Sequence, residues 1–195
     1  IAWANIPFIL FLVLTGNFIA NFFLMIMVYL VFAYSVSGLR FKETAFLDSL
    51  TSAFHYTSPF IFAILYFGGE DMWVGAFMAF YLWAAAQHAL GAIRDIKPDR
   101  EAGIRSIATK LGSRRTLYFC LLMYVLGAAA LFLEYGTQSV YGIAALAPYA
   151  LVIMSCLGVR NDNSPRYAKA WNRFMLLNYV VGGAISVTLL YLYNS

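Results

Sequence analysis

The chain has 195 residues, of which 63% are hydrophobic, 18% aromatic and only 11% charged. A soluble domain carries roughly 25% charged residues, so this chain has too few to cover a surface exposed to water. The composition excludes an ordinary soluble protein and indicates an integral membrane protein. The net charge of +4 requires no nucleic-acid partner, because the basic residues gather in a few connections between apolar runs.

Apolar runs of about 20 residues, the length that spans a bilayer as a helix, recur along the chain. They lack the alternation of barrel strands, and lipid requires every backbone polar group to be paired internally. We therefore expect an all-α, polytopic transmembrane helix bundle that forms one membrane-embedded domain over residues 1–195. The expected spans are 1–14, 18–36, 49–67, 73–92, 116–133, 140–158 and 174–192. Because the first run is short and begins at Ile1, we expect further sequence upstream.

Charge divides the connections into two groups. All 13 Lys and Arg residues fall in three connections, at 40–42, 94–115 and 160–173. The alternate connections hold no base, and their acidic residues are Glu70, Asp71 and Glu134. Basic loops of membrane proteins stay on the cytoplasmic side. We therefore expect the three basic loops in the cytoplasm, the C-terminus outside, and the protein in the plasma membrane of a prokaryote.

The second basic connection contains a predicted break and a predicted short helix. Pro98 disfavours helical geometry in the residue before it and would clash with the carbonyl four residues earlier. We expect the preceding span to end or kink between Asp95 and Pro98. Residues 104–111 can then form a short amphipathic helix over the mouth of the bundle, with Gly112 as its C-cap and Ser113 capping the next span.

Asp95 and Asp99 lie four residues apart at the point where an apolar span ends. Magnesium takes one or two carboxylates and completes its shell with phosphate oxygens and water. Neighbouring bases could neutralise the remaining charge of a bound diphosphate; they are Arg94, Lys97, Arg100 and Arg105. The alternative is a solvated loop of mixed charge. The sequence thus predicts a site for Mg2+ and a diphosphate at the membrane surface.

A polar stripe leads from this motif into the bundle. Tyr81, His88 and Asp95 are spaced seven residues apart and therefore share one face of a helix. Ionisable groups inside membrane helices are functional hypotheses by default. We expect Tyr81 and His88 to line a substrate cavity, and the alternative for His88 is a hydrogen bond to a neighbouring helix.

A second polar stripe consists of Thr51, His55 and Ser58. Pro59 removes the helical hydrogen bond to the carbonyl of His55 and predicts a kink. A kinked helix beside a cavity would make His55 a residue of the cavity wall. Polar packing between helices is the alternative.

The first basic connection supplies three further candidates. Tyr34 stands near the end of the second span, where it is a candidate for the substrate cavity. Arg40 and Lys42 follow it and could reach a phosphate group from the same side of the membrane. Their alternative role is to anchor the loop at the lipid headgroups.

The residues DIKPDREAGIRSIATKLG, at 95–112, resemble the UbiA superfamily of intramembrane prenyltransferases. Asp95 and Asp99 match the second aspartate-rich motif of that family, and GIRSIATKLG is similar to the run that follows it. The stretch YSVSGLRFK, at 34–42, resembles a family loop that contains Tyr and Lys. With FKETAFLDSLTSAFHYTSP included, the pattern is most similar to the lycopene elongases, which transfer a five-carbon prenyl group onto a carotenoid.

The resemblance implies nine transmembrane helices around a central cavity, in which two aspartate-rich motifs hold magnesium ions that bridge the diphosphate of an allylic donor. The seven expected spans would correspond to family helices three to nine. The first motif is then absent from this chain, and its metal site is half complete. The implied reaction is Mg2+-dependent transfer of a prenyl group from dimethylallyl diphosphate to lycopene, in the synthesis of C50 carotenoids.

Three alternatives remain open from the sequence. An acceptor that is an aromatic compound, a quinone precursor or a lipid would belong to the same enzyme class. A transporter would carry charges deep within several spans or paired helices broken by Gly and Pro, and the sequence has neither. A non-catalytic membrane subunit, acting with a partner subunit, is compatible with the missing first motif.

Overall fold

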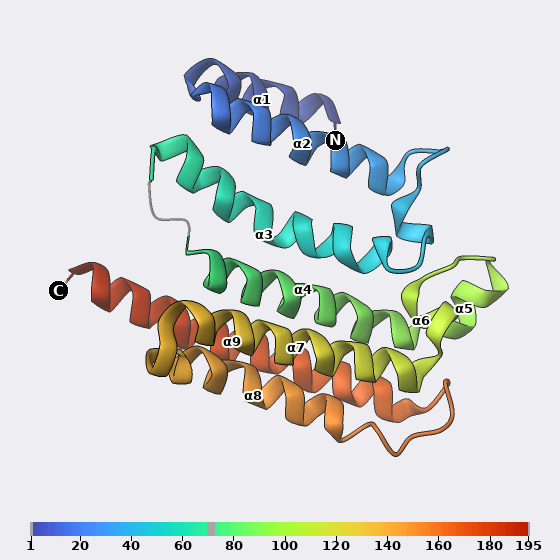
Figure 1. The fold of residues 1–195 in the computed structure, drawn as a ribbon. Helices are drawn as coiled ribbons and strands as arrows, with labels where there is room; N and C mark the ends of the chain where they lie inside the picture. The colour runs from blue at the N-terminus through green and yellow to red at the C-terminus, as the bar shows by residue number, and fades with distance from the viewer. Residues whose placement is uncertain (1, 70–72, 195) are drawn as a thin grey trace.

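A computed structural model describes residues 2–69 and 73–194, and the regular structure within these ranges is helical. Seven long helices lie side by side (Figure 1). They are α1 (Ala2–Thr15), α2 (Phe18–Ser35), α3 (Leu47–Phe67), α4 (Val74–Arg94), α7 (Ser113–Tyr135), α8 (Val140–Met154) and α9 (Pro165–Asn194). The connections contain the short helices α5 (Ile96–Glu101) and α6 (Ile107–Leu111), and the 3-10 turns η1 (Phe41–Glu43) and η2 (Gly136–Ser139).

The seven long helices coincide with the seven predicted apolar runs, and the all-α fold class is confirmed. By length and composition, three segments of the described chain are apolar enough to cross a membrane: Phe18–Ser35, Val74–Arg94 and Ser113–Met154. α7 and α9 begin earlier than predicted, because basic and polar residues extend these helices beyond their apolar parts. α8 ends at Met154, earlier than the predicted 158.

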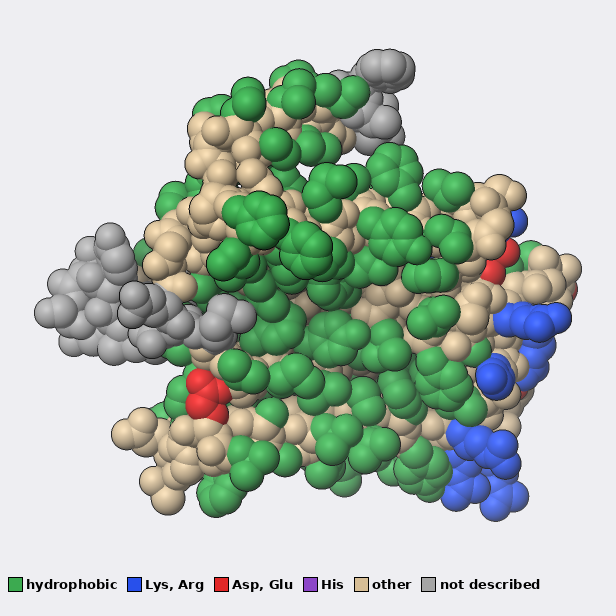
Figure 2. All heavy atoms as spheres, turned by 45° about the horizontal axis from the view of Figure 1, so that its top comes forward, with side chains coloured by type: hydrophobic (Ala, Val, Ile, Leu, Met, Phe, Trp, Pro, Cys, Tyr) green, Lys and Arg blue, Asp and Glu red, His purple; other side chains and the backbone are tan. Residues whose placement is uncertain are grey.

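α4 is the central helix of the bundle and packs against α3, α7 and α9. Small residues allow membrane helices to approach closely. Four alanines of α4 are fully buried and allow this approach: Ala84, Ala85, Ala86 and Ala89. A Cβ placed on Gly127 of α7 would lie 3.4 Å from the Cα of Ala79, which marks the same close approach. Large apolar side chains cover the outer surface (Figure 2), as lipid contact requires.

The two ends of the bundle differ in charge. Lys and Arg side chains gather on the right of Figure 2, at the end of the bundle that carries α5 and α6 on the right of Figure 1. At the opposite end, the Glu134 carboxylate of α7 accepts a hydrogen bond from the backbone N–H of Gly75, so it ties α7 to the start of α4. Glu70 and Asp71, which are predicted for the same end, lie outside the described residues.

The connection between α4 and α7 contains the predicted break. α4 ends at Arg94, and a new helix begins at Ile96, with Asp95 between them. The predicted short helix is wrong over its first turn, because α6 begins at Ile107 and not at 104. Gly103 turns the chain with a φ of +73°, and Ser106 has the extended backbone of an N-cap.

The predicted capping of α7 by Ser113 is also wrong. Gly112 occupies the N-cap position, and Ser113 is the first residue of the helix. The backbone N–H of Ser113 instead donates to Asp162 Oδ1 at 3.1 Å. Asp162 belongs to the connection between α8 and α9, so a distant segment supplies the cap that the local sequence does not.

Candidate functional site

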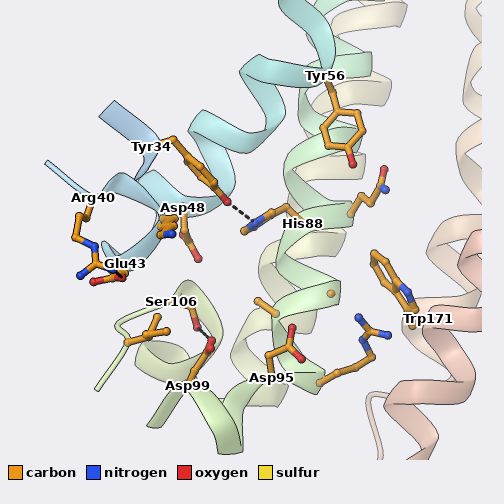
Figure 3. Close-up of a pocket in the computed structure, with 16 residues that line it drawn as sticks. Tyr34, Arg40, Glu43, Asp48, Tyr56, His88, Asp95, Asp99, Ser106 and Trp171 are labelled. Carbon is orange, nitrogen blue, oxygen red and sulfur yellow. Dashed lines mark hydrogen bonds and ion pairs between the residues drawn. The ribbon is translucent and has the colours of Figure 1, made fainter. Parts of the chain in front are cut away.

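A polar cavity of about 470 Å3 lies at the basic end of the bundle, between α2, α3, α4 and the α5–α6 segment (Figure 3). Trp171 of α9 forms part of its wall. Of the residues predicted for the site, seven line this cavity: Tyr34, Arg40, Lys42, His88, Arg94, Asp95 and Asp99. The structure places five others outside its lining: His55, Tyr81, Lys97, Arg100 and Arg105.

The two predicted carboxylates are fixed by the break after α4. Asp95 is the C-cap of α4, and its carbonyl accepts the backbone N–H of Asp99 at 2.8 Å. Asp99 Oδ2 accepts a hydrogen bond from the Ser106 hydroxyl at 2.9 Å. Burial raises the pKa of Asp99 above its usual range; the Ser106 hydrogen bond opposes this rise, and the negative charge of Asp95 adds to it. A cation placed between these two carboxylates would relieve that repulsion.

Three bases line the cavity with different neighbours. Arg40 forms an ion pair with Glu43, with Nη2 and Oε1 2.7 Å apart. The Arg94 guanidinium lies over the ring of Trp171, 4.6 Å from its centroid. A guanidinium held against an aromatic ring keeps its N–H groups available for an anion. Arg94 therefore has an orientation suited to binding phosphate oxygens.

Three of the predicted diphosphate-binding bases lie outside this cavity. Arg100 forms an ion pair with Asp162, with Nη2 and Oδ2 3.1 Å apart. Arg100 and Arg105 line a neighbouring cavity of about 800 Å3, which Arg40 also borders. Lys97 is exposed on α5. The structure therefore separates these bases from the group around Asp95 and Asp99.

His88 joins three helices at the cavity wall. Its Nδ1 lies 3.1 Å from the Ser49 hydroxyl of α3, and its Nε2 lies 3.4 Å from the Tyr34 hydroxyl of α2. Both interpretations of His88 therefore describe the structure, since it lines the cavity and also hydrogen-bonds neighbouring helices. Of the predicted stripe, Asp95 and His88 line this cavity and Tyr81 does not.

His55 and Tyr81 lie behind the lining. The His55 ring meets the ring of Tyr34 edge to face, with centroids 5.3 Å apart. The Tyr81 hydroxyl donates to the carbonyl of Leu50 at 3.0 Å. These contacts connect α2 with α3 and α3 with α4, which is the helix-packing role that polar residues have in membrane bundles.

Asp48 is a residue of the cavity that the sequence interpretation missed. It lies in the first turn of α3, is fully buried, and lines the cavity. Its Oδ2 accepts the backbone N–H of Ile107 at 2.8 Å. A charged residue at the start of an apolar span could have indicated a functional position. The hydrogen-bond partner of Asp48, however, lies 59 positions away in the chain.

Trp171 is the second missed residue. It reaches the cavity from α9, and a Cβ on Gly91 of α4 would lie 3.1 Å from its ring. Gly91 thus provides the space in which the Trp171 ring lies beside Arg94. No pattern in the sequence distinguishes this tryptophan from the other aromatic residues of the chain.

The charge balance of the cavity fits a metal ion better than a bare anion. Four carboxylates line it, from Glu43, Asp48, Asp95 and Asp99, against three bases. In the described part of the chain, no group of three His, Cys, Asp or Glu side chains is placed to hold a metal. Asp95 and Asp99 provide hard oxygen ligands, so an ion held there would complete its shell with phosphate and water oxygens.

The bundle is apolar, and its carboxylates, bases and an imidazole gather around one polar cavity at the basic end, as in a membrane protein with a charged binding site. The chain belongs to the UbiA prenyltransferase family, whose sequence profile matches residues 1–180. Members of this family generally use a divalent metal.

Several proteins of carotenoid synthesis are similar to the chain. The C(50) beta-cyclic carotenoids biosynthesis protein LbtBC of Dietzia sp. is 38% identical over 97% of this chain and 44% of its own length. A lycopene elongase/hydratase of Corynebacterium glutamicum is 34% identical over 97% of this chain and 66% of its own. The lycopene elongase/hydratase of Haloferax volcanii is 36% identical over 86% and 51%. The chain thus spans about half to two thirds of these relatives. No solved structure matches it.

Proposed function

We propose that this chain forms the catalytic part of a membrane enzyme that transfers a prenyl group from an allylic diphosphate to a carotenoid. The proposed donor is dimethylallyl diphosphate, and the proposed acceptor is lycopene. The observation that carries the proposal is the cavity in which Asp95, Asp99 and Arg94 meet at the basic end of an apolar bundle. The names of the relatives favour a carotenoid over an aromatic, quinone or lipid acceptor.

Asp95 and Asp99 are the proposed ligands of Mg2+, which would supply positive charge to a diphosphate as it departs. Arg94, Lys42 and Arg40 bind the remaining phosphate oxygens from the surrounding wall. These groups favour the state in which charge has moved onto the diphosphate, because their electrostatic stabilisation grows as that charge develops. The carbon–oxygen bond of the donor breaks with its electron pair on the diphosphate. The allylic cation then forms a carbon–carbon bond with the π electrons of an acceptor double bond, and the cation left on the acceptor loses a proton to water or to the departing diphosphate.

The proposed acceptor site is an apolar cavity, which a series of aromatic rings stacked through the core of the bundle connects to the polar cavity. Trp171 stacks on Phe174 with centroids 5.9 Å apart, Phe174 on Trp83 at 6.0 Å, and Trp83 on Phe80 at 5.6 Å. Phe80 and Trp83 also line a second cavity of about 510 Å3, whose wall is almost entirely apolar. Ring faces stabilise a cation, and an apolar cavity keeps water away from it. The apolar cavity therefore suits a polyene.

We further propose that residues 1–195 belong to one membrane-embedded domain in the plasma membrane of a prokaryote. The basic end, with α5, α6 and the polar cavity, faces the cytoplasm, because basic loops remain on that side. The donor then reaches the cavity from the cytoplasm, where an anionic diphosphate is soluble. A transporter is the weaker candidate, since the family to which the chain belongs is one of prenyltransferases.

The test uses the complete reading frame that contains this chain, expressed in cells that accumulate lycopene. Membranes receive dimethylallyl diphosphate and Mg2+, and the carotenoids are analysed by mass. We expect lycopene to gain five-carbon units, and Asp95→Ala and Asp99→Ala each to lower the rate by about 10²-fold or more. Lys97→Ala is the matched control, since Lys97 is a charged residue of the same segment that lies outside the cavity lining.

Three results would each contradict part of the proposal. Transfer of the prenyl group to another acceptor, with lycopene unchanged, would remove the elongase assignment. Full activity of Asp95→Ala would remove the metal assignment. A rate for Lys97→Ala as low as that of Asp95→Ala would show that the assay reports the charge of the loop and not this cavity.

A further inference from the structure

The hydroxyl of Ser106 connects the aspartate motif to the start of α6. Ser106 is 5% exposed, and its Oγ donates to Asp99 Oδ2 at 2.9 Å (Figure 3). The same oxygen accepts the backbone N–H of Thr109 at 3.3 Å, so Ser106 is the N-cap of α6. One buried side chain thus orients a carboxylate of the cavity and is itself oriented by a helix. This arrangement fixes which way Asp99 faces.

Asp48 holds the same segment from the opposite side. The Ile107 N–H, which Asp48 Oδ2 accepts at 2.8 Å, belongs to the residue directly after Ser106. Asp48 is fully buried in the first turn of α3, so this contact is shielded from water. Its second oxygen, Oδ1, has no hydrogen-bond partner within the described residues. The contact with α6 therefore uses one oxygen of the carboxylate.

A third contact holds the residue before Ser106. Arg105 pairs with Thr44 in an isolated parallel bridge, and Thr44 precedes α3. Three consecutive residues, 105, 106 and 107, are therefore each bonded to a different partner. Two of these partners belong to the connection before α3 or to its first turn. The position of Ser106 is thereby set by contacts distant in the sequence and not by α6 alone.

We propose that Ser106 is a positioning residue that orients Asp99 for a divalent cation, and that Asp48 holds Ser106 in place through the backbone of α6. The inference rests on the proposed function, in which Asp99 is a metal ligand. Hydrogen bonds from outside the ligand shell orient ligating carboxylates, and their loss lowers metal affinity by roughly 10–100-fold. Asp48 acts through an acceptor oxygen, so its negative charge is not what this role requires.

The test measures metal binding directly. The complete protein is purified in detergent, and its binding of Mn2+, as a stand-in for Mg2+, is followed by electron paramagnetic resonance. Ser106→Ala is expected to raise the dissociation constant by about 10–100-fold, and Ser106→Thr, which keeps a hydroxyl, to restore it. Thr109→Val removes a different hydroxyl of α6, which donates to the carbonyls of Ile104 and Ser106 and also lies 3.4 Å from the Ser106 hydroxyl. Because the Ser106 hydroxyl keeps Asp99 as its closer acceptor, at 2.9 Å, this variant should leave Mn2+ binding unchanged.

Two variants of Asp48 separate its oxygen from its charge. Asp48→Asn keeps an oxygen for Ile107 and should bind Mn2+ like the wild type. Asp48→Ala removes that oxygen and should weaken binding as Ser106→Ala does. Equal weakening by both variants would overturn the role given to Asp48, because it would show that the charge is required.

The outcome also distinguishes this inference from the proposed function. If Asp99→Ala binds Mn2+ as tightly as the wild type, the metal assignment itself is wrong. If Asp99→Ala abolishes binding but Ser106→Ala does not weaken it, only the positioning role is overturned. If Thr109→Val weakens binding as much as Ser106→Ala, general disturbance of α6 explains the effect, and the role of Ser106 is again overturned.

Discussion

Replacement of Asp162 tests how the connection between α8 and α9 supports the site. Asp162 Oδ1 accepts the backbone N–H of Ser113 at 3.1 Å, and Oδ2 pairs with Arg100 at 3.1 Å. Arg100 directly follows Asp99, so one carboxylate joins the start of α7 to the aspartate motif. Asp162→Asn keeps an oxygen for Ser113 but removes the charge, whereas Asp162→Ala removes both.

The expected loss of stability follows from how exposed the two contacts of Asp162 are. The side chains of Arg100 and Asp162 are 53% and 29% exposed, and exposed ion pairs contribute about 0–1 kcal/mol. Loss of a capping acceptor costs about 0.5–2 kcal/mol. We expect Asp162→Asn to lower the free energy of unfolding by up to about 1 kcal/mol, and Asp162→Ala by about 0.5–3 kcal/mol.

The charge contribution depends on pH in a defined direction. Hydrogen bonds from Ser113, its hydroxyl first, and the charge of Arg100 hold the pKa of Asp162 below its usual range. A carboxylate whose pKa is depressed by folding stabilises the fold fully above the pKa of the unfolded chain, about 3.9. This contribution is lost as the pH falls through the lower pKa of the folded state. The difference between wild type and Asp162→Asn should therefore be constant near pH 7 and shrink below about pH 4.

The assay is unfolding in mixed detergent micelles, followed by circular dichroism at several pH values. Arg100→Gln is the matched variant, and its effect should equal that of Asp162→Asn. The double variant should lose no more than either single one, because the two residues share one interaction. Two results would refute the ion pair between Arg100 and Asp162 as the source of the stability difference. One is full additivity of the two single losses in the double variant, and the other is a difference between wild type and Asp162→Asn that persists unchanged at the lowest pH.

Three further predictions concern close contacts. Gly75→Ala places a Cβ 2.5 Å from the Glu134 carboxylate, so we expect a loss of about 1–3 kcal/mol in the free energy of unfolding; equal stability in the unfolding assay would contradict the tight contact between α4 and α7. Gly91→Ala should displace the Trp171 ring, 3.1 Å from the new Cβ, and raise KM for the allylic diphosphate; an unchanged KM would show that the ring position is irrelevant to donor binding. Cys120 is fully buried, so maleimide should label it only after unfolding, and rapid labelling of the native protein would show that α4 and α7 separate.

The sequence predicts the helices well because apolar length and charge placement are local properties. Asp95 and the break beside it can both be inferred from residues within a few positions of each other, whereas the short helix α5 that follows the break is not predicted from the sequence. The error at 104–107 has a physical reason. Ile104 to Leu111 has helical periodicity, but the tie between Arg105 and Thr44 keeps the first part extended.

The rest of the site depends on contacts between distant segments. Asp48 and Trp171 come from α3 and α9, and their neighbours in the sequence do not indicate that they face the same cavity. Arg100 shows the opposite case: it stands beside Asp99 in the sequence, yet Asp162 directs it to another side. Proximity in the chain therefore identifies the motif, and only the packed bundle determines which bases accompany it.

The polar cavity at the basic end and the apolar cavity along Phe80 and Trp83 suit solutes from different phases, water for the first and lipid for the second. The polar cavity at the basic end is lined by seven charged residues, whereas the apolar cavity along Phe80 and Trp83 lies among membrane helices. For the proposed reaction, the effective concentration of the donor is its molarity in water, and that of the acceptor is its number of molecules per area of bilayer. Added lipid or detergent therefore dilutes the acceptor without changing the concentration of the donor. Rates should therefore follow the mole fraction of carotenoid in the membrane, and preparations with different lipid content become comparable only on that scale.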